Sequence, residues 1–182
     1  MRQTLVVTLL ILTITSAYAA DRTRAVNRPV VETSHVTPID GPWKIELTTS
    51  GGFGGGGTGD IRVDSDGNLT VGQFVTNGKS CRFVLLPGEL AQLNTIVRSI
   101  QPDLWFGSYV PADSRQLCCD LVFTKVVLER TELVEGNSRP QTGHYETQFL
   151  ETRRAPHDLM LLANVLAGGP DSLRSRYQPL CK

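Results

Sequence analysis

Short runs of alternating apolar and polar residues, separated by turn-forming residues, are the feature that most constrains the fold of this chain. Such alternation is typical of strands with one buried and one exposed face. Ser65–Asn68 and Asn77-Gly78 are turn signals, and Asn-Gly is strongly associated with β-hairpins. The first half of the chain is therefore predicted to form an antiparallel meander, with strands at Trp43–Thr48, Asp60–Asp64, Leu69–Val75 and Cys81–Leu86.

The second half combines helix and strand patterns. In two segments, apolar residues recur at helical spacing after a proline, a residue that suits the first turn of a helix. Two further segments are rich in apolar residues or alternate as strands do. The predicted elements are a helix from Pro87 to Pro102, a loop over 101–117, strands over 119–129 and 144–151, and a helix from Pro156 to Gly168.

Together these patterns predict an α+β fold. We expect an antiparallel, meander-like β-sheet of about five or six strands, with two α-helices packed on one face. Residues 42–182 are predicted to form one domain whose C-terminal tail is tied by a disulfide, because this length of chain is typical of a single domain.

The N-terminus has the three-part pattern of a cleavable signal peptide. Arg2 supplies a positive charge, Leu5–Ile14 is almost entirely apolar, and Ala17-Tyr18-Ala19 places small residues before a cleavage site. The apolar run is shorter than the roughly 20 residues that a spanning helix needs. We therefore expect a signal peptide over 1–19, cleavage after Ala19, a flexible leader over 20–41, and a secreted or periplasmic protein without a membrane span.

The charge distribution argues against a nucleic-acid partner. The chain has 18 Lys and Arg residues against 18 Asp and Glu residues. Nucleic-acid-binding proteins normally carry a basic stripe or patch. Since basic residues do not cluster beyond Arg153-Arg154 and the pair Arg174 and Arg176, this class of partner is not expected.

The four cysteines, an even count in a protein predicted to be exported, suggest two disulfides. Cys118 and Cys119 are adjacent, and the distance between their Cα atoms of about 3.8 Å is shorter than disulfides usually span. We therefore prefer a pairing of Cys81 with one of the two and of Cys181 with the other. A metal site is not expected, because neither a Cys-x-x-Cys motif nor a nearby His accompanies these residues.

Seven glycines lie between Gly51 and Gly59. The letters of a phosphate-binding glycine motif are present, but a strand follows where a helix must, so nucleotide binding is not expected. Two interpretations remain open. The segment is either a mobile hairpin loop or a contact loop whose bare backbone approaches a partner, with Phe53 as an apolar anchor.

Known catalytic motifs are missing from the sequence. The three histidines, His35, His144 and His157, do not form H-E-x-x-H, and no serine lies in G-x-S-x-G. A cysteine nucleophile needs a thiolate, and these cysteines are expected to be oxidised. The chain is therefore predicted to be non-enzymatic, with no catalytic residues, metal or cofactor.

Several segments resemble the emfourin-like family, small proteins similar to the protealysin inhibitor. The first strand runs into Thr-Ser-Gly-Gly-Phe-Gly-Gly (Thr49–Gly55), where the family typically has Gly-Gly-Phe-Ala-Gly. The resemblance covers about 43–168. The chain departs from the family in Gly54, in its longer glycine run, in its cysteines and in its tail. Further matching segments are Glu89-Leu90-x-x-Leu93, Cys118-Cys119-Asp120 before Phe123 and Thr124, and the helix after Pro156.

The resemblance implies an inhibitor of an exported, thermolysin-like metalloprotease. The matching contact residues would be Ser50, Gly51, Gly52, Phe53 and Gly54. The alternative is a structural or interaction module of the cell envelope, with an exposed sheet edge or apolar patch and a partner that can be a second copy. An enzyme with a site of unknown type is a third possibility, and it would require a pocket lined by convergent polar groups.

Overall fold

The structure is a computed structural model that describes residues 36–51, 59–72, 80–110, 122–150 and 155–181. All of these residues belong to a compact unit, Thr33–Lys182. The predicted signal peptide over 1–19 and the leader as far as residue 35 lie outside the described residues.

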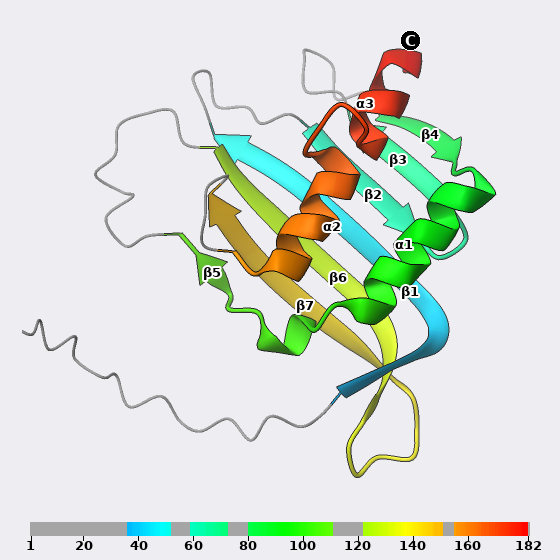
Figure 1. The fold of residues 1–182 in the computed structure, drawn as a ribbon, viewed down its shortest axis with the longest axis vertical. Helices are drawn as coiled ribbons and strands as arrows, with labels where there is room; N and C mark the ends of the chain where they lie inside the picture. The colour runs from blue at the N-terminus through cyan, green and yellow to red at the C-terminus, as the bar shows by residue number, and fades with distance from the viewer. Residues whose placement is uncertain (1–35, 52–58, 73–79, 111–121, 151–154, 182) are drawn as a thin grey trace, which may run out of the picture. The chain divides into compact units, whose positions relative to one another are not determined.

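Seven strands form one sheet, in the order β4-β3-β2-β1-β6-β7-β5 (Figure 1). All neighbouring strands are antiparallel except β5, which runs parallel to β7. The predicted α+β class and the meander of the first four strands are confirmed. The strands are β1 (Val36–Gly51), β2 (Gly59–Asp64), β3 (Asn68–Gly72), β4 (Ser80–Val84), β5 (Ser108–Tyr109), β6 (Val122–Val134) and β7 (Gln141–Leu150).

The helices α1 (Pro87–Ser99) and α2 (His157–Ala167) cover the same face of the sheet, as predicted (Figure 1). A third, short helix, α3 (Leu173–Tyr177), lies in the predicted tail. Two single 3-10 turns follow α1 and α3, at Pro102–Leu104 and Gln178–Leu180. None of the described helices is long and apolar enough to cross a membrane.

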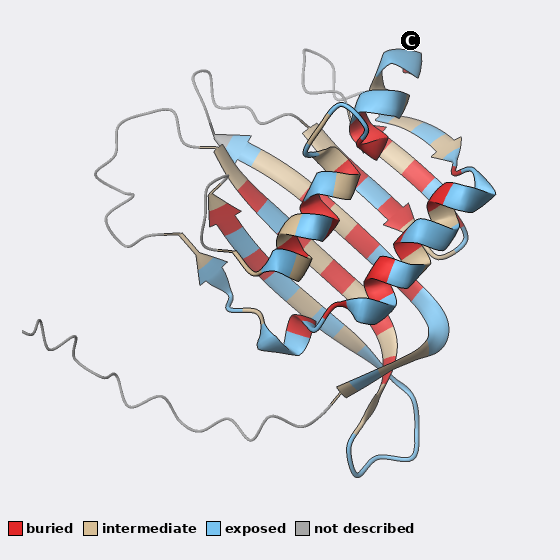
Figure 2. Ribbon diagram, viewed as in Figure 1, coloured by how far each residue is buried: buried red, intermediate tan, exposed pale blue. Residues whose placement is uncertain are grey.

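The core lies between the sheet and the helices (Figure 2). Alternate strand residues point toward the helices and are almost completely buried, and each such side chain contributes about 1.5–3 kcal/mol to folding. The opposite face, which we call the open face, carries mainly charged and polar side chains. Core residues on the strands include Ile45, Leu47, Ile61, Val63, Leu69, Val71, Val126 and Leu128, and those on the helices include Leu93, Leu159, Leu162 and Leu166.

The predicted leader over 20–41 was wrong at its end, because β1 begins at Val36. Val36–Pro38 pairs with Glu132–Val134 of β6, and the register shifts between Pro38 and Trp43. This irregularity, with two prolines and Gly41 close together, interrupts the alternation that identifies a strand. The sequence pattern therefore shows only the second part of β1.

The predicted turn at Ser65–Asn68 is confirmed. The Asp64 carboxylate accepts hydrogen bonds from the backbone N–H groups of Asp66 and Asn68, each at 3.0 Å. Gly67 has φ +82°, a conformation that glycine adopts at little cost. The Asn77-Gly78 hairpin lies outside the described residues.

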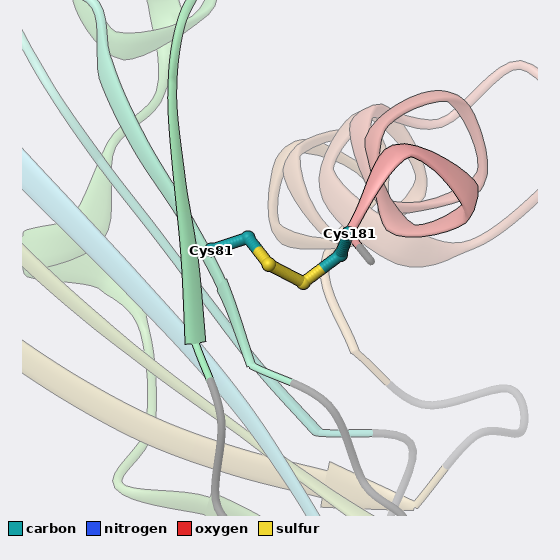
Figure 3. Close-up of a disulfide and its surroundings, with 2 residues drawn as sticks. All are labelled: Cys81 and Cys181. Atoms are coloured by element: carbon teal, nitrogen blue, oxygen red, sulfur yellow. A yellow bond between two sulfur atoms is a disulfide. The ribbon is translucent and has the colours of Figure 1, made fainter.

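The disulfide joins Cys81 to Cys181, with Cα atoms 5.6 Å apart (Figure 3). The preferred pairing of each with Cys118 or Cys119 was therefore wrong; those two cysteines lie outside the described residues. Cys81 points to the helix side of β4, and α3 packs on that side, where the rings of Tyr177 and Phe83 are 5.2 Å apart. This packing brings Cys181 to β4, so the C-terminal tail is tied to the sheet as expected, but through another partner.

Candidate partner-binding end of the sheet

Only part of the predicted contact segment lies within the described residues. Ser50 and Gly51 are the last two residues of β1, while Gly52, Phe53 and Gly54 lie outside the described residues. β1 and β2 are both interior strands of the sheet, and Thr49 is paired with Gly59 at the start of β2. The segment between them is therefore attached at both ends to the middle of the sheet.

A row of three side chains crosses the sheet at this end. Ser50 lies opposite Phe123 of β6, and Phe123 lies opposite Leu150 of β7. Directly paired residues share a face, and this row is on the open face. Ser50 is exposed, and Phe123 and Leu150 are half-buried. We call Ser50, Phe123, Leu150 and the adjoining Gly51 and Gly59 the loop end of the sheet.

Sequence reasoning did not identify Leu150 as part of this site. The signal was present, because Tyr145, Thr147 and Phe149 alternate on one side of the predicted strand and place Leu150 on the other. The alternation does not show which strand lies next to this one in the sheet. Only the pairing of β6 with both β1 and β7 brings Leu150 into line with Ser50.

A buried arginine on α3 forms a hydrogen bond with the backbone of the loop end. Arg174 of α3 is 6% exposed, and its Nη2 donates a 2.7 Å hydrogen bond to the Gly59 carbonyl oxygen. The Thr49 hydroxyl lies 3.4 Å from the same oxygen. Burial lowers the pKa of the Arg174 guanidinium, and the Asp60 carboxylate opposes this effect. The first residue of β2 is thus fixed to a helix that lies 115 residues further along the chain.

The short α3 helix is itself clamped at several points. The Ser172 hydroxyl caps it by accepting a hydrogen bond from Ser175 N at 3.2 Å. Near its other end, the Tyr177 hydroxyl donates to the Glu89 carboxylate at 2.6 Å, and Arg176 forms an ion pair with the same carboxylate at 2.5 Å. Burial, then the hydrogen bond to Glu89, raises the pKa of Tyr177. With the disulfide, these contacts fix the position from which Arg174 reaches Gly59.

A second buried arginine lies away from the loop end. Arg130 of β6 donates through Nη1 to the carbonyl oxygens of Val97 and Ile100, both at 2.9 Å, at the C-terminal end of α1. Its Nε lies 3.3 Å from Glu132, which also accepts a 2.6 Å hydrogen bond from the Tyr145 hydroxyl. Burial raises the pKa of Tyr145, and the hydrogen bond to Glu132 adds to the rise.

Arg130, Glu132 and Tyr145, which we call the Arg130 group, have a structural role. A cation at the C-terminal end of a helix satisfies free carbonyl groups and interacts favourably with the helix dipole. The neighbouring cavity, which Trp43 and Arg130 help to line, has a volume of about 30 Å³, space for no more than one or two water molecules. The group therefore joins α1 to the sheet without offering a pocket for a substrate.

The described histidines do not meet. His144 lies on the open face, with Nδ1 3.2 Å from the Glu129 carboxylate, and His157 is exposed at the start of α2. Within the described ranges, no group of three or more His, Cys, Asp or Glu side chains could hold a metal ion. His35 lies outside them. The absence of a metal and of catalysis remains a prediction.

The chain matches no known protein-family model, and no curated protein matches it significantly.

Proposed function

We propose that this chain is an exported, non-enzymatic protein-binding domain that inhibits a thermolysin-like metalloprotease through the loop end. The observation that carries the proposal is the fixed base of the contact segment. Ser50–Gly51 and Gly59 belong to interior strands, and buried Arg174 binds the Gly59 carbonyl oxygen at 2.7 Å. A binding loop on a rigid support loses less conformational entropy when it binds.

The choice of partner rests on the sequence. Thr49–Gly55 resembles the emfourin-like family, and the N-terminal pattern is that of a signal peptide. The disulfide is compatible with a compartment outside the cytoplasm. Phe123 and Leu150, which lie in one row with Ser50, add half-buried apolar surface there, and apolar surface suits the core of a protein interface.

Residual activity of thermolysin-like metalloproteases tests this function directly. Oxidised protein comprising residues 20–182 should abolish activity at a stoichiometric ratio. Phe53→Ala should weaken inhibition by about 1 kcal/mol or more, about fivefold, if Phe53 is an anchor. Leu86→Ala is the matched control, because Leu86 is an apolar side chain, 63% exposed, at the start of α1. Full protease activity in the presence of folded, uncleaved protein would refute the inhibitor function.

The alternative function, an interaction module of the cell envelope, is favoured by a different observation. β4 ends the sheet, and the described residues place no strand beyond it. Val84 at its end is 71% exposed. An uncovered strand edge is a template for pairing with another chain. If the partner is a second copy, size-exclusion chromatography should show a stable oligomer; a clean monomer would contradict self-association.

A further inference from the structure

The outer edge of β4 carries backbone groups that are not used by the sheet. Leu85 N donates to Gly67 O at 2.9 Å, in continuation of the register that pairs Phe83 with Leu69. In an antiparallel pair, the residues that bond to the neighbouring strand alternate. Cys81 and Phe83 therefore bond to β3, and the N–H and C=O groups of Ser80, Arg82 and Val84 point away from the sheet. These three residues also direct their side chains to the open face.

The same edge borders an open depression. It has a volume of about 490 Å³, and Asn68, Leu69, Thr70, Arg82, Phe83 and Val84 line it. The surface is mixed, with the hydroxyl of Thr70, the amide of Asn68 and the exposed apolar side chain of Val84. An extended peptide meets such a surface with alternate side chains, while its backbone pairs with the strand edge.

Arg82 gives this edge a charge preference. It forms no ion pair with any described residue, whereas Arg62, two strands away in the same row, pairs with Glu46 at 3.0 Å and with Asp60 at 3.8 Å. The free guanidinium lies at the middle of β4, where a residue of an added strand would face it directly. Opposite charges at such positions stabilise pairing.

The same residue disfavours a second copy as the occupant. The register that pairs β4 with another β4 along its whole length places Arg82 opposite Arg82. Like charges directly opposite each other destabilise a strand pair, and charged residues on edge strands act against self-association. An acidic partner strand meets no such obstacle.

We propose that the edge of β4 binds an extended peptide segment of a partner protein, adding it to the sheet with an acidic residue opposite Arg82. This inference rests on the second of the two proposed functions, the interaction module, and names its partner class. It is independent of the loop end, because β4 is separated from β1 by two strands.

The test uses a defined probe, an acetylated and amidated seven-residue peptide with the symmetric sequence Thr-Val-Thr-Glu-Thr-Val-Thr. Titration into isotope-labelled, oxidised mature protein should shift the amide resonances of Ser80, Arg82 and Val84. Arg82→Gln should weaken binding by about 1.5-fold to fivefold, the range for an exposed ion pair. Arg62→Gln is the matched control on the open face and should leave the affinity unchanged.

A charge-reversal variant and a backbone-methylated peptide separate the contribution of charge to binding from that of backbone pairing. Arg82→Glu should reject the glutamate peptide and bind the same peptide with lysine at the centre. Methylation of the backbone nitrogens of the glutamate and both valines should abolish binding, because strand addition needs these donors. Equal binding of the methylated peptide, or equal affinity of Arg82→Gln and the parent protein, would overturn the proposal.

The failure of this inference can be distinguished from the failure of either proposed function. Arg82→Gln should inhibit a susceptible protease as well as the parent protein does, since it leaves the loop end intact. A folded monomer that shows no amide shifts at millimolar peptide would refute the β4 site alone. A dimer that is more stable in Arg82→Gln than in the parent protein would indicate that a second copy, and not an acidic peptide, pairs with the edge of β4. That result would also overturn the proposal.

Discussion

Two buried arginines form similar hydrogen bonds in different parts of the molecule. Arg130 and Arg174 are 2% and 6% exposed, and both donate hydrogen bonds to backbone carbonyl oxygens. Arg130 lies on a long central strand and has a buried partner carboxylate, Glu132. Arg174 lies on a five-residue helix held in place by a disulfide and by Glu89.

The difference indicates what each group does. Arg130 connects the C-terminal end of α1 to the middle of the sheet, so its loss should affect the whole fold. Arg174 reaches the Gly59 carbonyl at the start of β2, beside the predicted contact segment. Its loss should act mainly on the loop end, provided that the clamp on α3 stays intact.

Arg130→Met should cause the largest loss of stability, because it leaves the Glu132 carboxylate buried without its cation. Breaking such a pair costs about 3–5 kcal/mol of the free energy of unfolding. Urea denaturation followed by circular dichroism measures this value. Arg130→Met combined with Glu132→Leu should recover part of the loss, since replacing both partners removes the unpaired charge. A single variant as stable as the parent would show that the pair does not matter to the fold.

Removing the disulfide should be the next largest effect. The bond closes a loop with a sequence separation of 100 residues, and loops of this length give about 4.7 kcal/mol in the chain-entropy model, although measured values are typically about 2–4 kcal/mol. Cys81→Ala with Cys181→Ala should lower the free energy of unfolding by about 3 kcal/mol. Hydrogen exchange should rise first in α3 and at Gly59. Uniform loss of protection over all strands would contradict a local clamp.

Arg174→Met should have a smaller effect on stability than Arg130→Met. The Gly59 carbonyl loses a buried donor, which costs about 1–3 kcal/mol. If the two arginines differ as proposed, this variant should also weaken protease inhibition. Arg98→Met, at an arginine on α1 whose side chain is 61% exposed and lies outside the clamp, is the control and should leave inhibition unchanged. Equal inhibition by all three proteins would separate Arg174 from the loop end.

The smallest expected effect is a dependence of stability on alkaline pH. Burial raises the pKa of Tyr145 and of Tyr177 above the ordinary value of 10.0, so both hydroxyls stay protonated in the folded chain where they ionise in the unfolded chain. The folded state then binds more protons than the unfolded state, and stability is fully present below pH 10 and falls as pH rises above it.

Denaturation with urea between about pH 9 and about pH 11 measures this decline. Tyr145→Phe with Tyr177→Phe should lose less stability over this range than the parent protein. An identical decline in the two proteins would assign the pH dependence to other groups.

The sequence predicted most of the regular elements and the class of the fold. Alternation identified β2, β3 and β4, and prolines with apolar spacing identified α1 and α2. It missed the start of β1, where a register shift between Pro38 and Trp43 interrupts the alternation. It also missed α3, because five residues are too few to show a helical period.

The candidate site was predicted only in part. Ser50 and Gly51 lie where a contact segment was expected, but Phe123, Leu150 and Arg174 were not foreseen as its neighbours. Each of them reaches the loop end from a different strand or helix, and the hydrogen bond from Arg174 to Gly59 spans 115 residues.

By itself, the sequence determined the local order: which segments are strands, which are helices and where the turns lie. These features follow from periodicity and from the backbone preferences of Gly and Pro, which act within a few residues. The tertiary structure alone decided that β6 joins β1, that β4 lies at an edge where no described residue forms an ion pair with Arg82, and that Cys181 meets Cys81. Such choices depend on the path of the whole chain, because strand neighbours, buried ion pairs and disulfides are selected by packing between segments that the sequence keeps far apart.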